Sequence, residues 1–250
     1  MLTVGTAPVT GSVHSFDIST GVDGPGTRFV AFLAGCPLRC LYCHSPDTQY
    51  RRYGRPTSVQ DLVTEIRRYE RFLKVAHGGV TLSGGEPLHQ PAFTREVLRR
   101  CTEMGLHTAL DTSGLLGDRA DNALLDATDL VLLDIKSGDP ATYRAVTRTG
   151  RLQPTVRFAR RLADRGMPIW VRFVLVPGLT DDPGNVEAVA SIAADLPTVE
   201  RVEVLPFHRL GARKYAALGL PFPLERTPPP DEALLRRVIG QFQDHGLTVY

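Results

Sequence analysis

Three of the chain's four cysteines lie within eight residues, in the segment GCPLRCLYCHSP at 35–46. Cys36, Cys40 and Cys43 form the pattern C-x3-C-x2-C. The same spacing would also place three thiols on one face of a helix, as ordinary buried side chains. Pro37 lies inside the motif and argues against a helix, because proline removes a backbone donor and restricts its neighbour. Three cysteines so close together in a loop indicate a metal site.

Two kinds of metal site fit these thiols. Zinc could bind Cys36, Cys40, Cys43 and His44, but a structural zinc site usually separates its ligands by two or more residues, and Cys43 adjoins His44. An iron–sulfur cluster fits better, and three thiolates on a four-iron cluster leave one iron open to a small molecule. Cys101 lies in an expected helix, and we interpret it as an ordinary buried cysteine.

Bulk properties exclude several classes of protein. A chain of 250 residues suits one large α/β domain or two small ones. A net charge of +2 and an ordinary composition give no support to a nucleic-acid or membrane role. No apolar run approaches the ~18 residues of a membrane span, and the N-terminus lacks a signal-peptide pattern. We expect a cytoplasmic protein that binds neither nucleic acid nor membrane.

Alternating strand and helix patterns must position the cysteine loop. Short aliphatic runs predict strands at 28–34, 79–84, 106–111, 129–135, 169–176 and 201–207, with a closing strand at 246–250. Amphipathic stretches predict helices at 58–76, with Ser58 as N-cap, and at 92–104, 122–127, 155–165, 185–196 and 231–245. Six strand–helix repeats predict parallel strands joined by right-handed crossovers. Either a doubly wound open sheet or a barrel-like (β/α) array satisfies that pattern.

Polar residues follow successive predicted strands. The segment SGGEP carries Glu86, which could receive a cationic amine, beside two glycines that let a ligand approach the backbone. Asp111, Asp134 and His208 end later strands. Each residue alone also fits a turn or a cap. Because the C-terminal ends of strands in a (β/α) array share one face, we expect these residues to converge with the cysteine loop on one cleft.

Two strands carry charges at positions that need explanation. Asp134 and Lys136 flank Ile135 and would point the same way, as a charged pair facing the cavity or as a simple salt bridge. Arg172 lies inside an apolar strand and needs a partner, either a ligand carboxylate or an internal Asp.

Several motifs together resemble a known family. In chain order they are VHSFDISTGVDGPGTRFVAFLAGCPLRCLYCHSPDT, SGGEPL, DTSG, DLVLLDIK, WVRFVLVPG and LPFHRLGARKY. From about Val13 onward the chain resembles the glycyl-radical activating enzymes of the radical S-adenosylmethionine (SAM) superfamily, of the type that acts on pyruvate formate-lyase. The resemblance implies an α/β fold, a single-domain partial (β/α)6 TIM-like barrel. We expect an N-terminal extension at 1–12 and a radical SAM core domain at 13–250.

The resemblance also implies an oxidoreductase chemistry. Cys36, Cys40 and Cys43 would hold a [4Fe–4S] cluster, and the amino and carboxylate groups of SAM would chelate the fourth iron. The reduced cluster would cleave SAM, and the resulting radical would take hydrogen from a backbone glycine of pyruvate formate-lyase (formate C-acetyltransferase) under anaerobic conditions. A reduced flavodoxin or ferredoxin is implied as the electron donor, and we expect a monomer.

Further site residues follow from the same resemblance. Those assigned to SAM are Tyr42, Cys43, His44, Gly84, Gly85, Glu86, Asp134, Ile135, Lys136, Arg172 and His208. Asp111 and Asp134 match a pair that helps to bind a monovalent cation near SAM. Asp23, in a tight turn, would contact the substrate glycine loop.

The chain departs from the family at Ser45, where Asn is usual, and it lacks the extra cysteines of related activases. That absence favours the pyruvate formate-lyase type. One alternative is a radical SAM enzyme for another glycyl radical enzyme or a small molecule, and a second is a non-catalytic metal-binding or redox-sensing module. A basic face would suit an acidic electron donor, although solvated surface is its commoner interpretation; its members are Arg28, Arg39, Arg51, Arg52 and Arg55.

Overall fold

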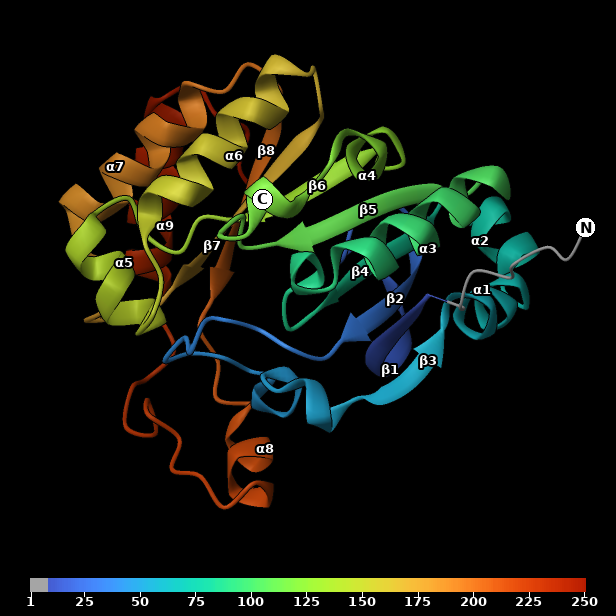
Figure 1. Cartoon of the computed structure of the whole chain (residues 1–250). Coiled ribbons are helices and arrows are strands. Elements are labelled where there is room, and N and C mark those ends of the chain that lie inside the picture. The colour runs from blue at the N-terminus through green and yellow to red at the C-terminus, as the bar shows by residue number, and fades with distance from the viewer. Residues whose placement is uncertain (1–8) are drawn as a thin grey trace, which may run out of the picture.

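A single curved sheet organises the chain (Figure 1). The computed structural model describes residues 9–250. The strands are β1 (Thr10–Thr20), β2 (Thr27–Leu33), β3 (Arg55–Ser58), β4 (Gly79–Gly84), β5 (His107–Thr112), β6 (Leu130–Asp134), β7 (Ile169–Leu175) and β8 (Val199–Pro206). Their order is β3-β1-β2-β4-β5-β6-β7-β8. β2 and β4 to β8 are parallel, and β1 is antiparallel to both of its neighbours, β2 and β3. The sheet is not closed, because β3 and β8 form its two edges.

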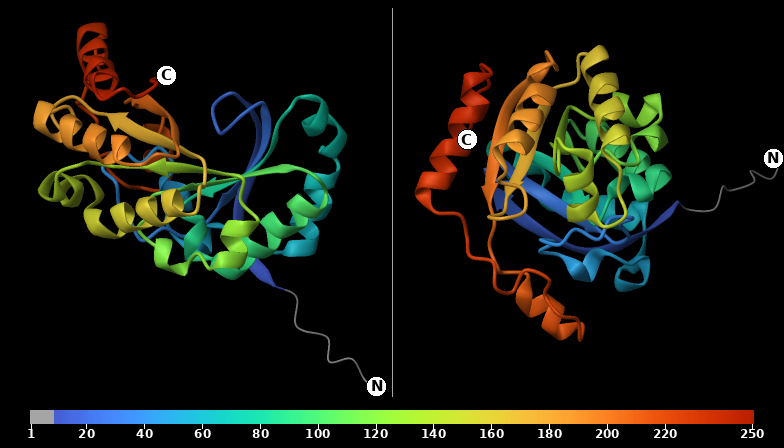
Figure 2. Two further views of the ribbon diagram at one scale, coloured as in Figure 1. Left: turned by 90° about the horizontal axis from the view of Figure 1, so that it is seen from above. Right: turned by 90° about the vertical axis from the view of Figure 1, so that its left-hand side faces the viewer.

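Helices follow most of the parallel strands and cover the convex face of the sheet (Figures 1 and 2). They are α1 (Val59–Arg67), α2 (Glu70–Val75), α3 (Pro91–Glu103), α4 (Asn122–Asp126), α5 (Pro140–Thr147), α6 (Leu152–Asp164), α7 (Pro183–Ala194), α8 (Ala212–Ala217) and α9 (Glu232–Asp244). Figure 1 shows α8 set apart from the others. The main hydrophobic core lies between the helices and the sheet. On β4, the side chains of Val80 and Leu82 pack in this core, and the alternating side chains of Thr81 and Ser83 point to the concave face.

The strand order decides between the two architectures that the sequence left open. All six predicted parallel strands are present, as β2 and β4 to β8. Their spatial order follows the chain order without the reversal that defines a doubly wound sheet. The prediction of an α/β partial barrel is therefore confirmed. The predicted closing strand is reduced to one parallel bridge between Val202 and Val249.

Local signals located most helices, but α5 and α8 were not predicted, and one predicted helix was wrong in extent. The helix predicted at 58–76 is two helices, α1 and α2, separated at Arg68 and Tyr69. Ser58 is the N-cap of α1, and its hydroxyl accepts a hydrogen bond from the Asp61 amide at 3.1 Å. Tyr69 packs against Phe29 of β2, with ring centroids 5.6 Å apart, so a tertiary contact accompanies the break.

The strands β1 and β3 were not predicted. β1 carries the polar sequence TGSVHSFDIST, and β3 contains Pro56, which favours an edge position. Residues 1–8 of the expected N-terminal extension lie outside the described residues. Residues 10–12 belong to β1, so the sheet begins before the expected boundary at residue 12.

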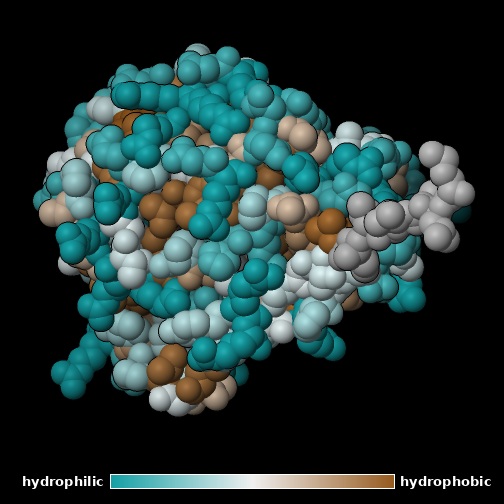
Figure 3. All heavy atoms as spheres, in the orientation of Figure 1, coloured by the Kyte–Doolittle hydropathy of each residue, from teal (hydrophilic) through white to brown (hydrophobic). Residues whose placement is uncertain are grey.

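The visible surface is mainly hydrophilic, and apolar residues are scattered over the face in Figure 3. In the described part of the chain, no helix is long and apolar enough to span a bilayer.

Candidate functional site at the C-terminal ends of the parallel strands

A cavity of about 500 Å³ opens at the C-terminal ends of the parallel strands. Its wall includes most of the residues that the sequence analysis selected: Asp23, Cys36, Cys40, Tyr42, Cys43, His44, Gly84, Gly85, Asp111, Asp134, Lys136, Arg172 and His208. The expected convergence of strand ends on one cleft is therefore present. Glu86 and Ile135 are the two selected residues that do not line it.

The three thiols come from the loop that follows β2. The amide of Gly35 donates to the Thr48 carbonyl at 2.7 Å, and the amide of Cys36 donates to Gln49 at 3.0 Å. Burial raises the pKa of the Cys36 thiol, and it raises the pKa of Cys40 to about 12. Without a metal these two thiols are protonated at neutral pH, so metal binding must displace their protons.

The donor set fits a multi-iron cluster better than a single ion. All three thiols are free and face the cavity. Among residues 9–250, no group of three or more Cys, His, Asp or Glu side chains could hold one metal ion. A cluster instead takes one thiolate per iron. Two buried polar atoms beside the thiols, Tyr42 Oη and Asp134 Oδ1, lack partners in the described structure, as expected where a polar ligand binds.

Glycines tie the SGGEP turn to the cysteine loop. Gly84 has φ +108°, and an added Cβ there would lie 2.4 Å from the Leu33 amide nitrogen. A Cβ on Gly85 would lie 2.6 Å from the Gly35 carbonyl oxygen, and the Gly85 amide donates to Leu33 at 2.7 Å. These glycines are therefore needed for close packing of two loops, in addition to any approach of a ligand.

Glu86 does not line the cavity, and it is only 1 % exposed. Its carboxylate accepts hydrogen bonds from the hydroxyls of Thr112 and Ser113, both at 2.7 Å, and from the amides of Ser113 and Leu88, both at 3.1 Å. Burial raises the pKa of Glu86, and these hydrogen bonds act against the rise. In this structure Glu86 holds the DTSG loop, and no oxygen is presented to a ligand amine.

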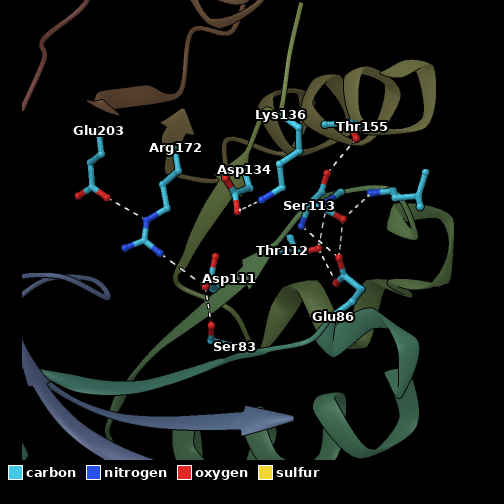
Figure 4. Close-up of polar contacts among 12 residues, drawn as sticks. Ser83, Glu86, Asp111, Thr112, Ser113, Asp134, Lys136, Thr155, Arg172 and Glu203 are labelled. Atoms are coloured by element: carbon cyan, nitrogen blue, oxygen red, sulfur yellow. Dashed lines mark hydrogen bonds and ion pairs between the residues drawn. The ribbon is translucent and has the colours of Figure 1, made fainter. Parts of the chain in front are cut away.

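Asp134 and Lys136 form the expected charged pair at the end of β6 (Figure 4). Burial acts to lower the pKa of Lys136, but the larger combined effect of Asp134, Tyr42 and Cys40 raises it. The pKa of Lys136 therefore lies well above its usual value. Ile135 between them is fully buried in the main core, so its side chain supports the strand end. Lys136 therefore stays charged at the cavity wall.

Arg172 of β7 has partners within the protein. Its Nε lies 3.0 Å from Glu203 Oε2, and its NH1 lies 3.5 Å from Asp111 Oδ2 (Figure 4). Asp23 lies 3.7 Å from NH2. Burial raises the pKa of Asp111 to about 6 against the opposing effect of Arg172. Because Asp111 already contacts Arg172 and the Ser83 hydroxyl at 2.5 Å, a monovalent cation at Asp111 and Asp134 stays a prediction.

The rim of the cavity carries the remaining predicted residues. The rings of His44 and His208 face one another with centroids 5.9 Å apart, although 164 residues separate them in sequence. The hydroxyl of Ser19 donates to Asp23 Oδ2 at 2.7 Å. The hairpin turn with Asp23 reaches into the half-barrel, because the Thr81 hydroxyl donates to the Asp23 carbonyl at 2.6 Å.

Several lining residues were missed. Ser83 alternates with the core residue Leu82 along β4, so the side-chain period could have identified it. Thr112 and Ser113 belong to the DTSG motif that ends β5, where strand alternation gives no such signal. Apolar lining residues such as Leu38 and Phe207 carry no sequence signal.

Two expectations about single residues are resolved. Arg28 is not part of a basic face, because it is fully buried and donates to Thr81 Oγ1 at 3.0 Å and to the Val80 carbonyl at 2.5 Å. Arg39, Arg51, Arg52 and Arg55 do lie beside or after the cysteine loop. Cys101 is fully buried in the main core, as expected of an ordinary cysteine.

Comparisons with known proteins agree with this geometry. Residues 30–186 match the Radical SAM superfamily. The chain is 38 % identical over 243 residues to pyruvate formate-lyase 1-activating enzyme of Escherichia coli K12, covering 96 % of this chain and 98 % of that protein. It is 40 % identical over 233 residues to pyruvate formate-lyase-activating enzyme of Listeria monocytogenes, covering 91 % and 94 %.

Solved structures show the same fold. A domain of pyruvate-formate lyase-activating enzyme from Bacteroides vulgatus superposes with a TM-score of 0.58 at 28 % identity, covering 69 % of this chain and 98 % of that chain. A radical SAM methyltransferase from Sphaerobacter thermophilus gives a TM-score of 0.64 at 17 % identity, covering 93 % and 71 %.

Proposed function

Because this chain belongs to the radical SAM superfamily, and within it to the pyruvate formate-lyase-activating enzymes, we propose that it installs the glycyl radical of pyruvate formate-lyase. The observation that carries this function is the convergence of three free thiols with polar strand-end residues on one cavity. When bound, the [4Fe–4S] cluster and SAM supply the electron and the radical that remove hydrogen from a backbone glycine.

The chain's own residues hold and shield these groups. Cys36, Cys40 and Cys43 would ligate three irons, and the fourth would take the amino and carboxylate groups of SAM. Lys136 provides a permanent positive charge at the wall for a carboxylate, and Gly84 and Gly85 leave room at the backbone. The rim residues Asp23, His44 and His208 would meet the adenosyl group or the incoming glycine loop.

The electron donor would approach the outer side of the cysteine loop. Arg39, Arg51 and Arg52 lie there, and Arg51 and Arg52 are exposed. Positive charges at that position suit a small acidic protein, so we propose a reduced flavodoxin or ferredoxin. A monomeric state, a cytoplasmic location and a core domain that begins near residue 13 belong to the same proposal.

An anaerobic spectroscopic experiment tests this function. The reconstituted, reduced protein is examined by EPR with and without SAM, and 5′-deoxyadenosine is quantified. We expect a reduced [4Fe–4S] signal that shifts on addition of SAM. Added pyruvate formate-lyase should then give a glycyl-radical doublet, with 5′-deoxyadenosine formed in proportion to the radical.

Other outcomes identify the alternatives. SAM cleavage that never yields a radical on pyruvate formate-lyase would indicate another glycyl radical enzyme or a small-molecule substrate. A colourless protein with one zinc, or a cluster whose EPR signal does not change when SAM is added, would indicate a structural or sensing role and would contradict the proposal. A pyruvate formate-lyase variant with Ala at the target glycine is the matched control for the doublet.

A further inference from the structure

The segment between Cys36 and Cys40 has no regular secondary structure, so its backbone carbonyls need partners from elsewhere. The carbonyl of Pro37 accepts a hydrogen bond from the Thr149 hydroxyl at 2.8 Å. In the described chain, the carbonyls of Cys36 and Leu38 receive hydrogen bonds from one group only, the guanidinium of Arg39. One side chain therefore accounts for two of the four backbone carbonyls between Cys36 and Cys40.

Arg39 reaches back over the loop that contains it. Its NH1 donates to the Cys36 carbonyl and to the Leu38 carbonyl, both at 2.6 Å. Hydrogen bonds from a charged donor are stronger than neutral ones. Arg39 thus holds two peptide units between the first and second ligands, Cys36–Pro37 and Leu38–Arg39.

Two neighbouring elements fix the position of Arg39. Its own amide donates to the Thr147 carbonyl at the end of α5, at 3.0 Å. Its guanidinium lies over the ring of Tyr50, 4.6 Å from the centroid, and Tyr50 follows Gln49, which accepts from the Cys36 amide. The side chain is therefore held between two segments that already bind the cysteine loop. No carboxylate in the described residues pairs with it, so its charge serves the loop carbonyls.

We propose that Arg39 is a positioning residue for the iron–sulfur cluster, holding the carbonyls of Cys36 and Leu38 so that Cys36 and Cys40 are spaced for ligation. The inference rests on the proposed function, because it requires a cluster at these thiols. It assigns Arg39 a role different from that of the exposed arginines of the basic face, which would meet the electron donor.

The structure offers a matched control. Arg52 lies over the same Tyr50 ring at 4.4 Å and also over Tyr53 at 5.1 Å. It carries the same charge, but it makes no hydrogen bond to a carbonyl of the cysteine loop in the described structure. Arg39→Gln and Arg52→Gln therefore remove the same charge from the same ring, and only the first releases the loop. Arg39→Lys keeps a charged donor at the position.

The experiment measures retention of the cluster. Wild type, Arg39→Gln, Arg39→Lys and Arg52→Gln are reconstituted anaerobically, and the loss of visible cluster absorbance is followed after addition of an iron chelator. We expect Arg39→Gln to lose its cluster at least about tenfold faster, the change expected for a lost hydrogen bond from a charged group. Arg39→Lys should recover part of that difference, and Arg52→Gln should match wild type.

Two further readouts separate positioning from a general loss of stability. The thermal midpoint of each metal-free protein should be the same, because the loop lies outside the main core. The EPR signal of the reduced cluster should broaden in Arg39→Gln only, because its ligand geometry is no longer unique.

Four results would overturn the inference. These are equal chelation rates in Arg39→Gln and wild type, equal acceleration in Arg39→Gln and Arg52→Gln, no rescue by lysine, or a lower thermal midpoint of metal-free Arg39→Gln. A wild-type protein that takes up no cluster would overturn the proposed function together with this inference.

Discussion

The Nε atom of Arg172 on β7 lies 3.0 Å from Glu203 Oε2 on β8. Both side chains are almost completely buried, and the same guanidinium also faces Asp111 of β5. The ion pairs therefore join three parallel strands across the concave face, and Arg172 and Asp111 belong to the wall of the cavity. Ion pairs between buried side chains of the protein itself therefore hold the wall of the site together.

Replacing Arg172 should destabilise the fold strongly. Arg172→Gln leaves Asp111 buried without its cation and Glu203 paired only with Arg201, so we expect a loss of about 3 kcal/mol in the free energy of unfolding. Urea unfolding of the metal-free protein measures it. Arg95→Gln is the control, because its ion pair with Asp121 is exposed and should contribute at most about 1 kcal/mol. Equal effects of the two changes would contradict this account of the strand ends.

Each loop cysteine should be necessary for the cluster, and the fourth should not. Cys36→Ser, Cys40→Ser and Cys43→Ser should each abolish SAM-dependent changes in the EPR spectrum, with iron and sulfide content reduced. Cys101→Ala should retain iron, sulfide and the spectrum, because Cys101 packs in the main core. Loss of the cluster in Cys101→Ala would mean that the fourth cysteine reaches the site.

Glu86 should act through the loops that it joins. In Glu86→Gln the amide NH2 would replace one oxygen and face the donors on that side, either Thr112 and Leu88 or the hydroxyl and amide of Ser113. We therefore expect a loss of about 2 kcal/mol in stability. SAM binding should weaken as the DTSG loop moves. Glu65→Gln, at a partly exposed pair with Arg68, should change stability by less than about 1 kcal/mol. Weaker SAM binding with unchanged stability would instead indicate a direct contact with the ligand.

Stability should fall between neutral and mildly acidic pH because of His107. Its Nδ1 lies 2.9 Å from NH1 of the buried Arg28, which can only donate, so Nδ1 must accept. Burial, and then Arg28, lower the pKa of His107 below its ordinary 6.5. The unfolded chain therefore binds the proton more readily than the folded chain. The contribution of neutral His107 to the free energy of unfolding is complete above pH 6.5 and is lost as the pH falls below that value.

The variant His107→Asn tests that assignment. An asparagine carbonyl can accept from Arg28 without titrating, so the dependence of unfolding free energy on pH between about 7 and 5 should become shallower. Urea unfolding across that range measures the slope. An unchanged slope would show that other groups produce the acid sensitivity.

Charge reversal on the outer side of the cysteine loop should slow electron delivery. Arg51→Glu with Arg52→Glu should reduce the rate at which flavodoxin or ferredoxin reduces the cluster, most strongly at low salt. Reduction by dithionite should be unaffected. Arg71→Glu with Lys74→Glu on α2, which precedes β4 at the opposite end of the sheet, is the matched control. Unchanged reduction by the protein donor would place its docking surface elsewhere.

Much of the site could be predicted from the sequence because its patterns span only a few neighbouring residues. The spacing of Cys36, Cys40 and Cys43 and the nearby prolines predicted a ligand loop, and the structure places it after β2. Asp134 and Lys136 face the same side because side chains alternate along a strand. The parallel strands were predicted because their aliphatic runs are short and evenly repeated.

Other features depended on contacts between distant residues. β1 has no clean apolar alternation, and it exists because β2 and β3 pair with it. Arg28 reads as one of several arginines near the cysteines, yet the register of β2 against β4 buries it. The sequence alone predicts a ligand group at Glu86, but in the structure the DTSG loop donates hydrogen bonds to its oxygens.

The sequence by itself determined which thiols are candidate ligands, most of the succession of strands and helices, and the family to which the chain belongs. These properties follow from spacing over a few residues and from repeated patterns. The tertiary structure alone decided which polar groups face the cavity and which are neutralised within the wall. Partners such as Arg172 and Glu203 lie 31 residues apart, and only the register between strands brings them together.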